Sequence, residues 1–296
     1  MGLTDLDHRP LIVAAVTPLS ENGTELDESP IAAYADFLES HGADGIFACG
    51  TTGEGVLLTL DERQRAAAAF RGASSGILIV HAGAQTTADT VRLAAHAAEI
   101  GADAVAVIPP PYFPLDDEAL SAHLVAAARA CAPLPFYCYA FSPRSGYALP
   151  TAVIRQLSAS VDNLAGLKVS ESPFERVRPY LGLGLPVLIG SEPLIADGLA
   201  GGAIGSVSGM SAAFPDVVRA ALDDPSETSM TRLQELRAAM ERSGQFIASA
   251  KHILGLRDVP VRSSMRAPLR PLHGRERVEL ERAVGAMGLL GAVAAG

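Results

Sequence analysis

One lysine of the sequence lies where its amine could act as a nucleophile. Of the 23 basic residues only two are lysines, Lys168 and Lys251. Lys168 stands inside the apolar run AGLKVS, which begins at Ala165. Burial lowers the pKa of a lysine, and the free amine can attack a carbonyl carbon to form a Schiff base. Lys168 is therefore a candidate Schiff-base lysine; the alternative is a lysine at the mouth of a strand with its ammonium in water.

Two further segments carry hydroxyl groups that could complete such a site. The segment GTTGE, Gly50–Glu54, sets Thr51 and Thr52 between glycines, where hydroxyl and backbone N–H groups could hold a carboxylate or an oxyanion. In the segment FYCYAFSPRSG, Tyr137 and Tyr139 alternate and so share one face of a strand, and Tyr139 could pass a proton. An ordinary glycine turn and packed tyrosines are the simpler interpretations.

Several other polar residues follow apolar runs. Arg144 offers a guanidinium fork for a substrate carboxylate. Tyr112 lies in the proline-rich segment IPPPYFP, and Glu192 ends the segment GSE, whose polar groups could bind substrate hydroxyls. The alternative for these residues is a solvated loop or, for Tyr112, an oligomer contact. Of the seven histidines only His81 stands near the end of an apolar run, and no His and carboxylate cluster has metal-ligand spacing, so the sequence predicts no metal.

All these segments belong to a regular alternation of short apolar runs and amphipathic, Ala-rich stretches. Eight such units between residues 10 and 222 predict a (β/α)8 TIM barrel, an α/β fold whose active sites lie at the carboxyl ends of the strands. A doubly wound open sheet is the competing fold, but no GxGxxG segment follows the first run. The runs begin at Leu11, Gly45, Ile77, Ala104, Pro135, Ala165, Pro186 and Ala203.

The pattern becomes entirely helical after about residue 224. It predicts a catalytic barrel domain over residues 1–223 and a C-terminal helical extension over 224–296. Within the extension, residues 259–274 are rich in Pro and Arg and are interpreted as a link between helices.

Composition limits the classes of partner. The 296 residues are 49% hydrophobic and carry a net charge of −10, with no basic stripe, which argues against nucleic acid and anionic membranes as partners. No apolar stretch approaches the roughly 20 residues of a membrane span. The acidic start is unlike a signal peptide, and three scattered cysteines form no disulfide framework, so we expect a cytoplasmic protein.

Taken together, these segments resemble the pyruvate-dependent class I aldolases, the dihydrodipicolinate synthase and N-acetylneuraminate lyase family. The resemblance runs from the first strand to the Gly-rich eighth and includes the helical extension. It implies that Lys168 forms a Schiff base with the keto carbon of pyruvate and that Tyr139 is the acid and base of the reaction. It also implies that Thr52 links Tyr139 to Tyr112, which would reach across a dimer interface.

The resemblance extends to substrate binding and assembly. Thr51 and Thr52 would hold the carboxylate of pyruvate, and the carbonyl of Val207 would face the lysine. The iminium is itself the electron sink, so no metal or organic cofactor is implied. Members of the family are often homotetramers built as a dimer of dimers, with pyruvate and an aldehyde as substrates.

The sequence says less about which aldehyde is the second substrate. Arg144 within SPRSG resembles the synthase branch, which slightly favours a 4-hydroxy-tetrahydrodipicolinate synthase-like reaction. Several residues depart from the synthase pattern: Ala140 replaces an Asn, residues 55–57 replace Ser-Ala/Pro-Thr, Pro111 replaces the first Tyr of a Tyr pair, and Ala212 replaces an Asn. These departures concern the aldehyde and leave the Schiff-base residues intact.

Three alternatives remain open. Glu192 after Gly190 could serve sugar hydroxyls, as in aldolases and dehydratases for 2-keto-3-deoxy sugar acids or in N-acetylneuraminate lyases. A catalytically silent keto-acid sensor is an alternative of another class, although a binder needs no proton relay. A phosphate-binding barrel that uses the glycines at 201, 202 and 205 is the weakest, because such loops also serve packing.

Overall fold

The computed structural model describes residues 3–290, so the outermost ends of the two expected domains, 1–2 and 291–296, lie outside the described residues. Eight parallel strands follow one another in sequence order and close into a barrel, which confirms the expected fold class. The strands are β1 Leu11–Ala14, β2 Gly45–Ala48, β3 Ile77–His81, β4 Ala104–Val107, β5 Phe136–Ala140, β6 Leu164–Val169, β7 Val187–Ile189 and β8 Gly205–Ser208.

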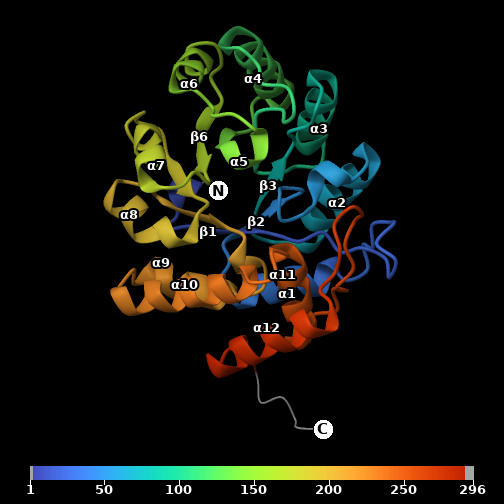
Figure 1. The fold of residues 1–296 in the computed structure, drawn as a ribbon. Coiled ribbons are helices and arrows are strands. Elements are labelled where there is room, and N and C mark those ends of the chain that lie inside the picture. Colours follow the sequence, from blue (N-terminus) through green and yellow to red (C-terminus); the bar gives the residue numbers. More distant parts are fainter. Residues whose placement is uncertain (1–2, 291–296) are drawn as a thin grey trace.

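Helices surround the barrel as an outer ring (Figure 1). The helices between the strands are α1 Ile31–Ser40, α2 Leu60–Ala73, α3 Thr87–Glu99, α4 Asp117–Cys131, α5 Ser142–Ser145, α6 Thr151–Ser158, α7 Phe174–Leu181 and α8 Ile195–Ala200. After β8 come α9 Pro215–Asp223, α10 Glu227–Glu241, α11 Phe246–Leu256 and α12 Gly274–Ala286. Short 3-10 turns are η1 Leu3–Asp5, η2 Gly55–Leu57, η3 Glu192–Leu194 and η4 Met210–Ala212.

Local capping explains where several helices begin. The Thr59 hydroxyl accepts a hydrogen bond from the backbone N–H of Glu62, whose side chain in turn accepts from the Thr59 N–H, forming a capping box before α2. At α3 the capping hydroxyl is that of Thr86, which accepts from the Asp89 N–H. Such a side chain satisfies one of the N–H groups that the first turn of a helix leaves unpaired.

The strands are apolar throughout because both of their faces are covered. Leu11 and Val13 of β1 belong to the layer between the barrel and the helices, whereas Ile12 and Ala14 face the interior of the barrel. This period of two is expected for parallel strands buried on both sides. Tyr137 and Tyr139 both point into the interior, which decides between the two faces that the sequence had left open.

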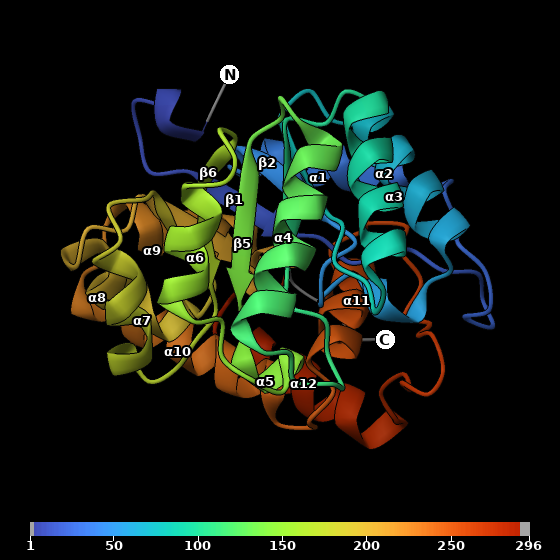
Figure 2. The same ribbon diagram turned by 90° about the horizontal axis from the view of Figure 1, so that it is seen from above.

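The helices after β8 lie on one side of the barrel. Figure 1 shows α10, α11 and α12 together on the side where α9 lies. Helix α10 contacts α9, η3, α11 and α12, and α11 also contacts α12. In Figure 2, β5 points toward the end of the molecule where α5 and α12 lie, while the dark blue turn η1 lies at the opposite end. The extension therefore reaches the carboxyl ends of the strands. None of the helices in residues 3–290 has the length and apolar character to cross a membrane.

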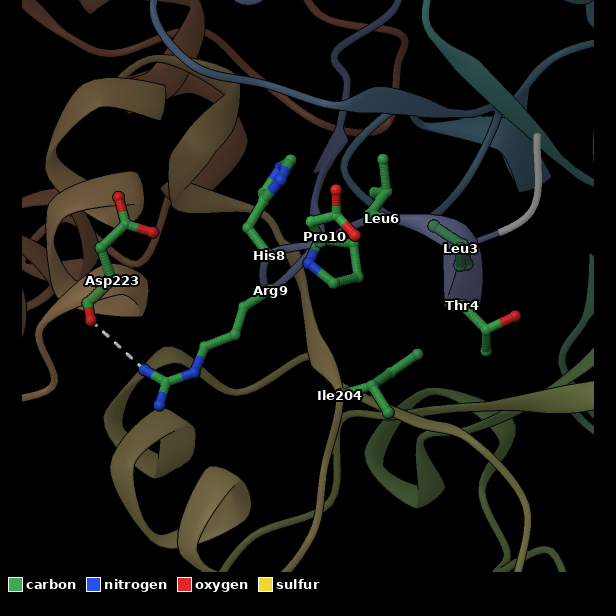
Figure 3. A pocket seen from close by; sticks show the side chains of 9 residues that line it. Leu3, Thr4, Leu6, His8, Arg9, Pro10, Ile204 and Asp223 are labelled. Atoms are coloured by element: carbon green, nitrogen blue, oxygen red, sulfur yellow. Dashed lines mark hydrogen bonds between the residues drawn. The ribbon is translucent and has the colours of Figure 1, made fainter.

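A hollow of about 540 Å³ lies at the other end of the barrel, where the chain enters β1 and β8. Figure 3 shows Arg9 reaching Asp223, whose backbone oxygen accepts a hydrogen bond of 3.4 Å from the Arg9 guanidinium. Because Pro10 and Ile204 directly precede strands, this hollow is remote from the strand ends that carry the candidate site. It is lined by Leu3, Thr4, Leu6, Asp7, His8, Arg9, Pro10, Ile204 and Asp223.

Candidate active site

Lys168 points into the barrel near the carboxyl end of β6. Its Nζ lies 3.9 Å from the centroid of the Phe47 ring and 4.2 Å from that of Tyr139. The residue is only 4% exposed. Burial lowers the pKa of Lys168 to about 7, against a smaller opposing effect of the negative charge on Glu192. A substantial share of this amine is therefore uncharged at neutral pH, the form that attacks a carbonyl carbon.

Tyr139 is the register partner of Lys168 in the parallel pair of β5 and β6. Burial raises the pKa of Tyr139, although hydrogen bonds with the side chains of Thr51 and Ser170 act in the opposite direction. The phenol therefore keeps its proton at neutral pH. It can donate that proton to a group bound at Lys168, because the two side chains share the barrel interior.

Ser170 is a site residue that the sequence analysis missed. It stands two residues after Lys168, so strand alternation places both side chains on the same side. A Cβ at position 190 would lie 2.0 Å from the Ser170 Oγ, so the glycine after β7 leaves the hydroxyl its room. The period of two in AGLKVS was the signal that could have identified Ser170.

The two threonines of GTTGE point to different places. Thr51 contacts Tyr139, whereas the Oγ1 of Thr52 would lie 3.2 Å from a Cβ at Gly209, beyond β8. Within one chain, Tyr139 therefore contacts the hydroxyl of Thr51 and not that of Thr52, which corrects the expected link through Thr52. The reason is that consecutive residues of a turn point in different directions. Val207 of β8 faces the same interior cluster and is 1% exposed.

Arg144 lies on α5, at the carboxyl end of the barrel, and is exposed. The Glu171 carboxylate fixes the start of this short helix by accepting hydrogen bonds of 2.6 Å from the Ser142 N–H and hydroxyl. The Arg144 guanidinium stacks 5.8 Å from the centroid of the Phe141 ring. Its positive charge helps to lower the pKa of Tyr139, opposing burial, which places Arg144 within electrostatic reach of the site.

Glu192 is 2% exposed, and its carboxylate accepts hydrogen bonds from the last residue of β8 and from the two residues that follow it. One carboxylate oxygen accepts from the Ser208 hydroxyl at 2.7 Å and from the N–H groups of Gly209 and Met210 at 2.9 and 3.0 Å. The other oxygen pairs with Arg237 of α10. The carboxylate therefore fixes a site loop, and its expected contact with substrate stays a prediction. Nothing in the local sequence around Arg237 signals this role.

Tyr112 stands apart from the other expected residues. It is 82% exposed in the chain, and its ring packs edge-on against Phe113 at 4.8 Å between centroids. Its φ of 84° lies in the left-handed region, which bulky residues rarely adopt. The structure thus brings together Lys168, Tyr139 and the GTTGE loop, while Tyr112 is exposed and packs only on its neighbour Phe113 among the ring contacts of the described residues.

His81 packs against Phe47 and Tyr139, the two rings that cover the amine of Lys168. Its ring centroid is 5.9 Å from that of Tyr139, and burial holds the pKa of His81 well below the usual value, so the ring is neutral. Among residues 3–290, no group of three or more His, Cys, Asp or Glu side chains could hold a metal ion.

Comparison with known proteins places this arrangement in a family. Residues 7–287 match the model of the dihydrodipicolinate synthetase family. An uncharacterized DapA-like lyase of Halobacterium salinarum is 35% identical over 94% of each chain, and an N-acetylneuraminate lyase of Danio rerio is 40% identical over 54% of each chain.

The fold is shared with a solved structure. A prophage protein of the dihydrodipicolinic acid synthase family from E. coli K12, in complex with pyruvate, superposes with a TM-score of 0.88 at 23% identity, over 96% of this chain and all of that one. These matches confirm the expected family and the class of lyases and synthases. The chain belongs to the dihydrodipicolinate synthetase family.

Proposed function

We propose that the protein is a Schiff-base-forming lyase or synthase, a class I aldolase that joins pyruvate to an aldehyde or cleaves the corresponding 2-keto acid. The observation that carries this proposal is the buried amine of Lys168, whose pKa is lowered to about 7 beside the protonated Tyr139. The proposed catalytic domain is the barrel, residues 1–223, followed by the helical extension, 224–296.

The chemistry needs only groups of the chain. The free amine of Lys168 adds to the keto carbon of pyruvate, and the Tyr139 phenol protonates the departing hydroxyl, which leaves as water. The iminium withdraws electrons, so the adjacent methyl gives a proton to the Tyr139 phenolate left by the previous step and becomes an enamine carbon that attacks the aldehyde. Hydrolysis of the product iminium returns the lysine. In the cleavage direction the same steps run in reverse, and no metal or organic cofactor takes part.

Substrate positioning follows from the loops around the lysine. Hydroxyl and N–H groups of Thr51 and Thr52 hold the pyruvate carboxylate, and the carbonyl of Val207 faces the amine. Arg144 at the barrel mouth binds a carboxylate of the aldehyde, which favours a 4-hydroxy-tetrahydrodipicolinate synthase-like reaction. A sugar-acid or N-acetylneuraminate-type aldolase is the second candidate, favoured by the 40% identity to the Danio rerio lyase; Glu192 would then bind sugar hydroxyls.

The assembly that we propose is a homotetramer built as a dimer of dimers. An exposed tyrosine in a strained backbone is stable when surrounding contacts compensate for the strain. A second copy of the chain would cover Tyr112 and receive it at its own site, where Thr51, the threonine that contacts Tyr139, connects the two tyrosines. The three cysteines are free and buried, as in the cytoplasmic location that we propose.

The Schiff base is tested by intact mass after incubation with pyruvate and borohydride. We expect the wild-type chain to gain one reduced pyruvate adduct, located by peptide mapping at Lys168, and Lys168→Met to gain none because it keeps the volume but lacks the amine. Tyr137→Phe, on the neighbouring strand, is the matched control and should be labelled like the wild type. A wild-type chain that gains no adduct, or an adduct that persists in Lys168→Met, contradicts the proposal.

The aldehyde class is tested with Arg144→Met. For an amino-aldehyde that carries a carboxylate, we expect kcat/KM to fall by about 10- to 100-fold, the effect of one charged hydrogen-bonding pair. Adduct formation with pyruvate should be unchanged. If the wild type turns over a neutral sugar aldehyde instead and Arg144→Met has no effect, the sugar-acid alternative is correct. Pyruvate labelling without turnover of any aldehyde supports the sensor.

The role of Tyr112 is tested by light scattering and turnover together. We expect a mass of four times the 30.6 kDa of one chain. We also expect Tyr112→Phe to lower kcat by about 100-fold, the lower end of a proton-transfer contribution. Phe113→Leu, which keeps an apolar neighbour, serves as the control. An active monomer, or full turnover in Tyr112→Phe, would show that no second copy completes the site.

A further inference from the structure

A fully buried ion pair joins the GTTGE loop to the helical extension. The Nζ of Lys251, on α11, lies 2.5 Å from a carboxylate oxygen of Glu54, and both side chains are 0% exposed. Lys251 also donates to the carbonyl oxygen of Ser264 at 2.9 Å. The second oxygen of Glu54 accepts from the backbone N–H of Arg266 at 2.8 Å. The only other lysine of the chain is thus paired, and the catalytic scheme does not use it.

Stability alone does not explain this pair. Moving two charges out of water costs about as much as their attraction returns, and apolar residues of similar volume can do as well. What distinguishes the pair is its place in the loop. Glu54 has a φ of 56°, a left-handed conformation that is uncommon outside glycine, and its N–H donates to the Thr51 carbonyl at 3.1 Å. The ion pair therefore fixes the turn that aims both threonines.

The charge of Lys251 matters as much as its position. A carboxylate of Glu54 without its cation would place a buried negative charge next to the threonines that receive the anionic end of pyruvate. Buried like charges interact strongly because little water screens them. Lys251 neutralises Glu54 from α11, in the helical extension.

We propose that Lys251 is a positioning residue for the reaction: through Glu54 it holds Thr51 and Thr52 in the arrangement that binds the carboxylate of pyruvate. It acts from the extension and does not touch the substrate. This inference rests on the proposed function, because it concerns how the same loop binds pyruvate. It assigns to α11 a part in substrate affinity, separate from the chemistry at Lys168.

The test measures the rate of adduct formation under cyanoborohydride as the pyruvate concentration is varied. In Lys251→Met we expect the half-saturating pyruvate concentration to rise by about 10- to 100-fold, as a displaced binding loop would cause. The rate at saturation should stay within about twofold, because an interaction lost from substrate binding raises KM without lowering kcat. A purely structural role would lower the melting temperature and leave half-saturation unchanged.

Two further variants make the test decisive. Glu54→Gln removes the negative charge without leaving a bare carboxylate. Where its amide NH2 faces the Arg266 N–H, two donors meet and that hydrogen bond is lost. We expect the half-saturating pyruvate concentration to rise, by less than in Lys251→Met. Arg219→Met is the matched control. Arg219 pairs at 3.1 Å with Asp44, which directly precedes β2, whereas Lys251 pairs with Glu54 in the loop that follows β2. We expect its half-saturation to equal that of the wild type.

The outcomes separate the inference from the function on which it rests. A wild-type chain that forms no adduct contradicts the proposed function. Adduct formation with wild-type half-saturation in Lys251→Met and Glu54→Gln overturns the inference, as does an equal rise in Arg219→Met. If Lys251→Met fails to fold, Glu54→Gln alone decides by the same criterion.

Discussion

The site depends on keeping one amine out of water. Lys168 enters the barrel at the carboxyl end of β6, where the rings of Phe47 and Tyr139 cover its Nζ. Water would stabilise the ammonium; the aromatic rings do so less, and the pKa of Lys168 falls to about 7. The eight-stranded barrel, the apolar interior and the inward alternation of β5 and β6 all serve to hold this side chain in that environment.

Two carboxylates near the site form ion pairs with cations other than Lys168. Glu54 pairs with Lys251 and Glu192 pairs with Arg237, and both cations come from the helices that follow the barrel. Within residues 3–290, Lys168 itself has no ion-pair partner. This division is physically consistent, because a carboxylate bonded to Lys168 would hold the amine in its protonated form and remove its nucleophilicity.

The sequence predicted the barrel, and it pointed to the side chains that the structure brings together around Lys168, because both follow from short-range patterns. The apolar runs that contain Tyr139 and Lys168 predict strands with these residues near their ends, and the glycines and threonines of GTTGE predict a polar loop. The contacts it could not supply span long distances along the chain: Arg237 and Lys251 stand in ordinary amphipathic helices, and only the packing of the extension brings them to loops far earlier in the sequence. The choice of Thr51 over Thr52 as the neighbour of Tyr139 required the geometry of the turn itself.

The most direct test of this account is the titration of the amine. Because the chain has only two lysines, protein labelled with ¹³C at the lysine ε-carbon gives two resonances, and Lys168→Met identifies the one of interest. The account predicts that the Lys168 resonance titrates with a pKa of about 7, so that lowering the pH through that value protonates the amine. A titration near the ordinary lysine value of about 10.4 would contradict it.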